Sequence, residues 1–457
     1  MNPVQKREDG VKMIKNHILN LILRINGKNF EKEYFEIKSI NSKEALLEFH
    51  QKHLKKLLLH AYNNVPYYHY VFKEIGLINN NNVDLSKFNK IPILTKEIIR
   101  KHYHELISKD YTKRNWYYNS SGGSTGEPLR FIQDNFYLRW DSAVKYYYNE
   151  DILGIDEVRG KKIFLWGSER DIFRGSMGLK SKIDRWLRNT VFLNSFRMTE
   201  DDMKKYIKII NSYKPEFIEG YAGSLYELCR YAERGKLKIY TPRVVVSTAE
   251  TLSNEMREKI EDVFRTKVYD LYGSREVVNL AGECKEGLMH IFLFGNCVEI
   301  LNTDNKAVKE GEEGKVIVTD LHNYSMPFIR YEIGDMAVFG TEKCKCGNIL
   351  PTLKNITGRI TDHFVKEDGA IISGSALTIT FNLKDWVKKF QIIQKDYKKV
   401  EILIVRKGKV NEFEKREIED KIKFLLGQDC EVIWSFVDII PKTPQGKYLY
   451  IKSLLWR

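Results

Sequence analysis

The segment from residue 119 to residue 128 has the composition best suited to chemistry, because it gathers small hydroxyl side chains and glycines. Glycine adopts positive φ and allows close backbone approach, so such a loop can surround phosphate oxygens with main-chain N–H groups. It is not a Walker A loop, since Glu127 stands where a lysine would follow the glycine. A flexible surface loop has a similar composition, and the segment alone leaves both interpretations open. The candidate phosphate-binding residues are Ser120, Ser121, Gly122, Gly123, Ser124, Thr125 and Gly126.

Two later segments have the residue types of a nucleotide site. Residues 272–276 follow a predicted strand; there the ring of Tyr272, next to Gly273, could stack on a planar base, and Glu276 could hold a divalent cation. In residues 327–335, Asp335 follows a glycine and can accept two hydrogen bonds from ribose hydroxyls. The alternatives are an ordinary strand-to-helix turn for the first segment and a hairpin aspartate for the second.

A loop near the C-terminus presents a lysine. Pro441, Pro444 and Gly446 restrict its backbone, and Lys447 lies at its tip. A lysine in this position can neutralise charge that develops on a phosphoryl group. The alternative is that Lys447 is one of many surface lysines.

Four residues have the donor types of a metal site. Cys284, His290, Cys344 and Cys346 supply three sulfurs and one imidazole on turns that flank a β-rich segment. A Cys₃His set is a closed tetrahedral site for zinc, and a closed site is structural because it leaves no open position for a substrate. The alternative is a set of unligated reduced thiols, with His290 on a strand edge. The other cysteines, Cys229, Cys297 and Cys430, are predicted to be ordinary buried residues.

Composition limits the class of protein. A chain of 457 residues with 43% hydrophobic residues can form two or three globular domains. The net charge of +14 is spread along the chain, which argues against a nucleic-acid-binding protein and favours a lysine-rich solvated surface. The most apolar segment, residues 17–25, is short and contains Arg24, and no signal-peptide pattern occurs. We therefore expect no transmembrane segment and a location in the reducing cytoplasm.

The spacing of apolar residues predicts the helices and strands that must position these candidate residues. Residues 1–110 are predicted to be helical; a run of apolar residues at helical spacing ends at Pro66, and Thr95 caps another helix. Strands are then predicted to alternate with helices, which is typical of a largely parallel sheet. The carboxyl ends of these strands would carry residues 247–250 and 272–276, where ligands bind in such sheets. The four predicted strands are 162–167, 217–221, 243–247 and 267–272.

The fold class expected from this pattern is α/β. A large N-terminal domain, residues 1–358, would contain mostly parallel sheets and a β-rich subdomain at about 284–357. A small mobile α+β domain would follow at 359–457, with strands at 400–405 and 432–436 on either side of a charged helix at 411–426. Gly358 would give the hinge its backbone freedom.

These segments, in this order, resemble the adenylate-forming superfamily of acyl-CoA synthetases and peptide-synthetase adenylation domains. Within it, the chain looks like the phenylacetate-CoA ligase group, especially its capsular-polysaccharide-biosynthesis branch. The resemblance runs from about Ala61 to Lys447 and includes residues 64–68 and 91–96. It implies that ATP activates a carboxylic acid to an acyl-adenylate, and that the small domain rotates before the acyl group is transferred.

The resemblance also implies a role for each segment. Ser120 to Gly126 would close over the β- and γ-phosphates, and Glu276 would contact Mg²⁺. Lys447 would bridge the carboxylate and the α-phosphate, and Arg359 would reach the nucleotide near the hinge. Ala249, Glu250, Tyr272 and Gly273 would frame the adenine and the acyl pocket, while Asp335 would bind the ribose. Some relatives show a comparable cysteine-histidine pattern, which supports a structural zinc ion.

The chain departs from the family in the loop, where Gly123 is an extra glycine, and in the segment after Asp362. Glu127 replaces a common lysine, and residues 365–375 lack the basic-glycine-valine-asparagine turn that helps form the thiol tunnel of the coenzyme A ligases. The acceptor is therefore coenzyme A or, alternatively, an amine or hydroxyl on a sugar, as in a ligase that modifies a capsular polysaccharide precursor. A degenerate nucleotide-binding scaffold is a third interpretation, which the complete motifs disfavour. The sequence leaves the oligomeric state open, with a homodimer as one alternative.

Overall fold

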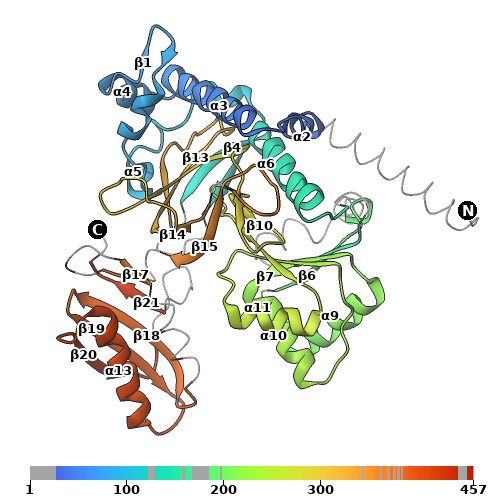
Figure 1. Cartoon of the computed structure of the whole chain (residues 1–457), viewed down its shortest axis with the longest axis vertical. Coiled ribbons are helices and arrows are strands. Elements are labelled where there is room, and N and C mark those ends of the chain that lie inside the picture. Colours follow the sequence, from blue (N-terminus) through green and yellow to red (C-terminus); the bar gives the residue numbers. More distant parts are fainter. Residues whose placement is uncertain are drawn as a thin grey trace, which may run out of the picture.

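The computed structural model of the chain describes residues 27–121, 129–156, 160–166, 185–195, 198–341, 343–359, 363–365, 367, 371–373, 377, 381, 384–440 and 450–455. It contains a large mixed α/β part followed by a smaller C-terminal part with its own sheet (Figure 1). Within the described ranges, every helix is too short or too polar to cross a membrane.

Helices dominate the first described residues. The longest, α3 (Lys43–Asn64), begins at Ser42, whose side chain accepts a hydrogen bond from the Ala45 N–H. Pro66 ends this helix and also takes the first position of the next one, where its missing N–H costs nothing. The remaining elements of this region are α2 (Glu31–Lys38), α4 (Pro66–Glu74), β1 (Ile78–Asn79), β2 (Asn82–Val83), η1 (Leu85–Lys90), α5 (Lys96–Lys101) and η2 (Tyr111–Lys113).

A mixed sheet forms the centre of the large part. Its strands are β5 (Lys162–Trp166), β6 (Thr190–Asn194), β7 (Phe217–Tyr221), β8 (Val244–Thr248), β9 (Val268–Tyr272), β10 (Ala281–Glu283), β11 (Met289–Ile291), β12 (Asn296–Leu301), β13 (Glu313–Asp320), β14 (Tyr331–Phe339) and β15 (Thr352–Arg359). In space they follow the order β12-β13-β14-β15-β11-β10-β9-β8-β7-β5-β6. In the half of the sheet formed by β6, β5, β7, β8 and β9, neighbouring strands are parallel. In the other half, from β9 through β10, β11, β15, β14 and β13 to β12, neighbouring strands are antiparallel. The β-rich segment therefore continues the parallel strands as one sheet.

Alternating apolar residues bury both faces of the parallel half. Ile218, Val245 and Val268 pack in one core against α9 (Glu200–Tyr213), α10 (Ala222–Arg234) and α11 (Asn254–Phe264). Their neighbours Phe217, Val244 and Leu271 face the other way, into a core with Trp140 and Val144 of α6 (Asn135–Tyr147), which continues into the short π-helix η3 (Tyr148–Ile152). Because successive strand residues point to opposite faces, runs of apolar residues suit a sheet covered on both sides.

The C-terminal part has a core of its own. Its four-stranded sheet has the order β20-β19-β18-β21, and α13 (Glu412–Leu426) packs on it through Ile418, Ile422 and Leu426. Asn411 caps α13 by accepting hydrogen bonds from the Phe413 and Glu414 N–H groups. The strands of this sheet are β18 (Val387–Asp396), β19 (Lys399–Arg406), β20 (Glu431–Phe436) and β21 (Ile451–Ser453). A separate two-stranded sheet contains β16 (His363–Val365) and β17 (Ile371–Ser373).

The α/β fold class and the four parallel strands expected from the sequence are confirmed, and Thr95 caps α5 as predicted. Two local expectations were wrong. The turn at 272–276 leads to strand β10 and not to a helix. Asp335 lies inside β14 and not at a strand end or in a hairpin turn, because β14 pairs with β13 on one side and β15 on the other along most of its length.

Candidate nucleotide site and metal centre

The base of the candidate phosphate loop is a short hairpin. Strands β3 (Trp116–Ser120) and β4 (Arg130–Asp134) pair antiparallel, with Ser120 opposite Arg130. Two hydrogen bonds then close the loop base: the Ser121 N–H donates to the Leu129 carbonyl at 2.8 Å, and the Leu129 N–H donates to Ser121 Oγ at 2.9 Å. Ser120 and Ser121 are buried. Residues 122–128, which include Gly122, Gly123, Ser124, Thr125 and Gly126, lie outside the described residues.

The carboxyl ends of β8 and β9 lie side by side, as the sequence predicted. Thr248 Oγ1 donates to the Leu271 carbonyl at 2.8 Å, which joins the two ends directly. The next residue, Ala249, has φ +66°, a left-handed conformation that is uncommon for a residue with a Cβ. Glu250 turns toward the start of α10, where its Oε2 accepts a hydrogen bond from the Gly223 N–H at 2.8 Å. Strained backbone at the carboxyl edge of parallel strands is typical of a ligand site.

Tyr272 and Asp335 meet although 63 residues separate them. The Tyr272 hydroxyl donates to Asp335 Oδ2 at 2.9 Å, and both side chains are mostly buried. Gly273 follows where the chain passes close to itself, since a Cβ at this position would lie 2.8 Å from the Asn279 nitrogen. The aromatic and acidic residues predicted for adenine and ribose are thus brought to one place.

Glu276 lies next to the same group. Its Oε1 accepts a hydrogen bond from the Tyr331 hydroxyl at 3.3 Å, and the Ser274 Oγ accepts from the Glu276 N–H at 3.2 Å. Gln133 Nε2 donates to the Glu276 carbonyl at 3.2 Å. Glu276 is therefore held from two directions, by the strand that carries Asp335 and by the hairpin that carries the loop.

These contacts join the described parts of the predicted site into one network. The hairpin contacts Glu276, Tyr272 contacts Asp335, and Asp335 is the strand partner of Arg359 in β15. Only the backbone of Arg359 is described, and Lys447 lies outside the described residues. Sequence reasoning gave no role to Gln133 or Tyr331, because each acts through a contact with a distant segment.

We predict that Tyr272→Phe raises the KM for ATP about five- to tenfold, equivalent to about 1–1.4 kcal/mol, because Asp335 loses one donor that holds its carboxylate. Steady-state kinetics with varied ATP measure this effect. Tyr269→Phe is the matched control, since it removes a tyrosine hydroxyl from the same strand outside the network. An unchanged KM in Tyr272→Phe would contradict a role for this hydrogen bond.

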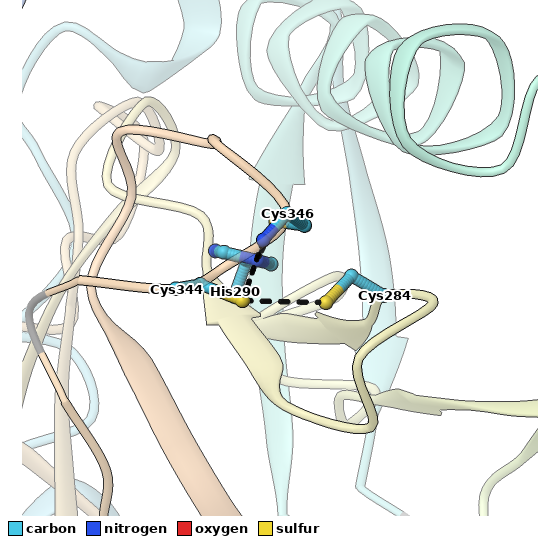
Figure 2. A group of neighbouring side chains, drawn as sticks. All are labelled: Cys284, His290, Cys344 and Cys346. Atoms are coloured by element: carbon cyan, nitrogen blue, oxygen red, sulfur yellow. Dashed lines mark hydrogen bonds between the residues drawn. The ribbon is translucent and has the colours of Figure 1, made fainter.

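The predicted metal ligands also converge. The ligand atoms of Cys284, His290, Cys344 and Cys346 all lie within 4.8 Å of one another. Cys284 follows β10, His290 lies in β11, and the other two cysteines lie in the connection from β14 to β15. Figure 2 shows the four side chains pointing toward a common centre. His290 is fully buried in a strand paired on both sides, so the alternative of an edge position was wrong.

The geometry of this cluster suits tetrahedral zinc. Cys284 and Cys344 sulfurs lie 3.7 Å apart, too far for a disulfide but close to the roughly 3.8 Å expected between two thiolates each about 2.3 Å from one ion. His290 Nδ1 lies 3.0 Å from the Leu350 carbonyl oxygen, which can only accept, so Nδ1 carries the proton. The other nitrogen, Nε2, then offers its lone pair on the side of Cys346, whose sulfur is 3.1 Å away.

Burial sets the protonation of the metal-free cluster. It lowers the pKa of His290, which keeps the imidazole neutral and able to ligate. Burial also raises the pKa of the Cys284 thiol, and it raises that of Cys346 to about 12. Because zinc binds thiolates, metal binding at this cluster must release protons.

Comparison with known proteins gives relatives for both parts of the chain. Residues 364–454 match the family described as the CapK C-terminal domain. The chain is 26% identical to Protein CapK of Staphylococcus aureus, over 94% of this chain and 95% of that protein. It is 23% identical to the phenylacetate-coenzyme A ligase of Thermus thermophilus, over 85% of this chain and 84% of the relative.

A solved structure shares the fold. The crystal structure of 2-hydroxyisobutyryl-CoA ligase, in the postadenylation state with R3-HIB-AMP, superposes with a TM-score of 0.64 at 16% identity. The match covers 90% of this chain and 89% of that one. The sequence relatives are of the kind to which the motifs pointed, and the solved structure shares the fold of this chain.

Proposed function

We infer that this chain, a homologue of the adenylate-forming, phenylacetate-CoA ligase-like group, is a ligase that activates a carboxylic acid with ATP. An oxygen of the acid attacks the α-phosphorus of ATP, the bond to the β-phosphate oxygen breaks, and pyrophosphate leaves. The resulting mixed anhydride is then attacked at its carbonyl carbon by an acceptor nucleophile, and AMP leaves. The observation that carries this proposal is the convergence of the loop base, Glu276, Tyr272 and Asp335 in one contact network.

Each residue of the network has a proposed task. Tyr272 and Gly273, with Ala249 and Glu250 on the neighbouring strand end, frame the adenine and the acyl pocket. Asp335 accepts hydrogen bonds from the ribose hydroxyls. The loop from Ser120 to Gly126 is assigned to the β- and γ-phosphates. The N–H groups of Ser120 and Ser121 already donate to Asn119 Oδ1 and the Leu129 carbonyl, so these two residues would hold the base of the loop.

The transition state concentrates negative charge, and the chain offers groups of opposite charge. Glu276 would hold Mg²⁺, which neutralises charge on the phosphates. Lys447 would stabilise the charge on the α-phosphate and the attacking carboxylate, and Arg359 would bind the nucleotide at the start of the C-terminal part. The division at residue 359 then gives a small domain that rotates after adenylation and withdraws Lys447.

Coenzyme A is the acceptor best supported by the names of the relatives. The match to CapK over nearly the whole chain favours a second candidate, transfer to an amine or hydroxyl of a capsular polysaccharide precursor. The unusual sequence at residues 365–375 is consistent with this second acceptor, because the thiol tunnel of the coenzyme A ligases passes there.

The cysteine cluster is proposed as a structural zinc site. Its four ligands leave no open position, so the ion would stabilise the fold without taking part in the reaction. It would fasten the β10–β11 hairpin, next to the strand that carries Tyr272, to the connection between β14 and β15.

Pyrophosphate release by the purified protein, screened against aryl, fatty and amino acids, tests the proposed activity. We expect release that requires one class of acid together with ATP. Adding coenzyme A or an amino sugar to the reaction then distinguishes the acceptors by which product forms. If no acid of any class supports release, the proposed function is wrong.

A further inference from the structure

The carboxylate of Glu276 takes its orientation from one tyrosine. The Tyr331 hydroxyl donates to Glu276 Oε1 at 3.3 Å, and both side chains are buried. Within the described part of the chain, every hydrogen bond to this carboxylate ends at Oε1, so Oε2 is available to a cation. A buried carboxylate with one oxygen held and the other available fits Mg²⁺, which proteins commonly bind through one or two carboxylates.

The backbone around Glu276 is fixed independently of its side chain. Ser274 Oγ accepts hydrogen bonds from the N–H groups of Glu276 and Val277 at 3.2 and 3.1 Å. These bonds hold the turn but leave the rotatable bonds of the glutamate side chain free. The hydroxyl of Tyr331 is therefore the contact that selects the direction of the carboxylate.

The residue before Tyr331 has a strained backbone. Arg330 has a φ of +51°, a left-handed conformation that is uncommon for a residue with a Cβ. Its N–H donates to Thr319 Oγ1 at 2.8 Å, and its carbonyl accepts from the Leu94 N–H at 2.9 Å. A strained residue of this kind persists only where the surrounding structure fixes it, and such residues cluster at functional sites.

The side chain of Arg330 supplies much of that fixation. It is 3% exposed, and its guanidinium forms a two-pronged ion pair with Glu299 of β12, with N–O distances of 2.9 and 3.0 Å. Nη1 also donates to the backbone carbonyls of Asn89 and Ile91, both at 2.6 Å. Arg330 thus fastens the start of β14 to β12 and to the segment that precedes α5.

The backbone of Tyr331 is held on both sides as a result. Tyr331 pairs with Val318 of β13 and forms a parallel bridge with Leu94, whose carbonyl accepts from the Glu332 N–H at 3.0 Å. Its ring packs against Phe328, with 5.0 Å between the ring centroids. The hydroxyl of Tyr331 is therefore delivered to Glu276 by a rigid support.

We propose that Tyr331 is a positioning residue that orients the Glu276 carboxylate for Mg²⁺, and that the strained conformation of Arg330 directs the Tyr331 side chain to it. The proposal rests on the proposed function, in which Glu276 holds Mg²⁺. Partners that hydrogen-bond a metal ligand typically change metal affinity about 10–100-fold when they are removed. The effect should therefore appear with magnesium-bound ATP and not with ATP alone.

The test is isothermal titration of the full chain with ATP, once with excess Mg²⁺ and once with EDTA. Tyr331→Phe keeps the ring and removes the hydroxyl, and we expect it to raise the Kd for Mg·ATP about tenfold. The Kd for metal-free ATP should stay within about twofold of that of the unsubstituted chain. Thermal unfolding of each variant confirms that it is folded.

Tyr68→Phe is the matched control. The buried Tyr68 hydroxyl donates to the Pro327 carbonyl and accepts from the Ile329 N–H, both at 3.1 Å, so it supports the same segment of the chain. Glu276 is not among these partners. Tyr68→Phe should therefore leave the ratio of the two Kd values unchanged, even if it lowers stability.

A double variant separates positioning from a structural effect. Glu276→Gln should itself reduce the preference for Mg·ATP over metal-free ATP, because the ligand loses its charge. Adding Tyr331→Phe to Glu276→Gln should then reduce this preference no further, since no ionised carboxylate is left to orient. Additive losses would mean that Tyr331 acts on magnesium binding by another route.

The outcomes distinguish this inference from the proposed function. An unchanged Kd for Mg·ATP in Tyr331→Phe, or equal weakening with and without Mg²⁺, would overturn the positioning role alone. Failure of the unsubstituted chain to bind ATP under either condition would reject the proposed function, and with it this inference. If Tyr331→Phe does not fold, Glu276→Asp, which withdraws the carboxylate from the hydroxyl, is measured instead. An unchanged preference for Mg·ATP in Glu276→Asp would also overturn the proposal.

Discussion

Lys447→Ala should lower the rate of acid-dependent ATP–pyrophosphate exchange by roughly 10²–10³-fold, the effect of losing one preorganised electrostatic contact in a transition state. The lysine would act where the carboxylate meets the α-phosphate, so its loss should reduce kcat more than it raises the KM for ATP. Exchange of labelled pyrophosphate into ATP, measured over a range of ATP concentrations, separates these two effects.

The same C-terminal segment provides the control. Lys442 lies five residues earlier between two prolines, and Lys442→Ala removes an equal charge. It should leave the exchange rate within about twofold, since the proposed mechanism gives Lys442 no role. The transfer half-reaction from preformed acyl-adenylate should survive Lys447→Ala if the small domain rotates and withdraws this residue. Full exchange activity in Lys447→Ala would remove Lys447 from the proposed mechanism.

Loss of the cysteine cluster should have the largest effect on stability. We expect about one zinc ion per chain, and Cys344→Ser should abolish it and lower the melting temperature by roughly 10 °C, because metal binding contributes directly to folding free energy. Metal analysis of purified protein and thermal unfolding measure the two effects. Removing zinc from the unsubstituted protein with a strong chelator should produce a similar shift.

Cys297→Ala is the matched control for the metal site. Cys297 lies in β12 and is not a member of the cluster, so its substitution should leave the zinc content unchanged. Substoichiometric zinc in protein purified without chelators would contradict the structural zinc site. An unchanged zinc content in Cys344→Ser would contradict the assigned ligands.

The positions of the site segments could largely be predicted from the sequence. β-branched runs marked the parallel strands, and the carboxyl ends of parallel strands meet at one edge of a sheet, so the proximity of Ala249 and Tyr272 follows from topology. The cysteine cluster was also predictable, because the Cys₃His donor set is specific and its members flank short strands.

The contacts that complete the site could not be predicted from the sequence. Tyr331 contacts Glu276 from 55 residues away, and Gln133 does so from 143 residues away. A single tyrosine or glutamine in a strand carries no local pattern that marks such a contact. The position of Asp335 was wrongly predicted for a related reason. A Gly-Asp pair is typical of a turn, and Gly334 does have a positive φ of 92°, but β14 pairs with strands on both sides and continues through Asp335.

The most direct test of ATP-dependent acid activation is isotope exchange by the unsubstituted protein, with labelled pyrophosphate, ATP and magnesium, with and without a carboxylic acid. Adenylation is reversible, so the label should enter ATP when the correct acid is present and only then. Label that enters ATP equally without acid, or that never enters it with any aryl, fatty or amino acid, would contradict an acyl-adenylate mechanism.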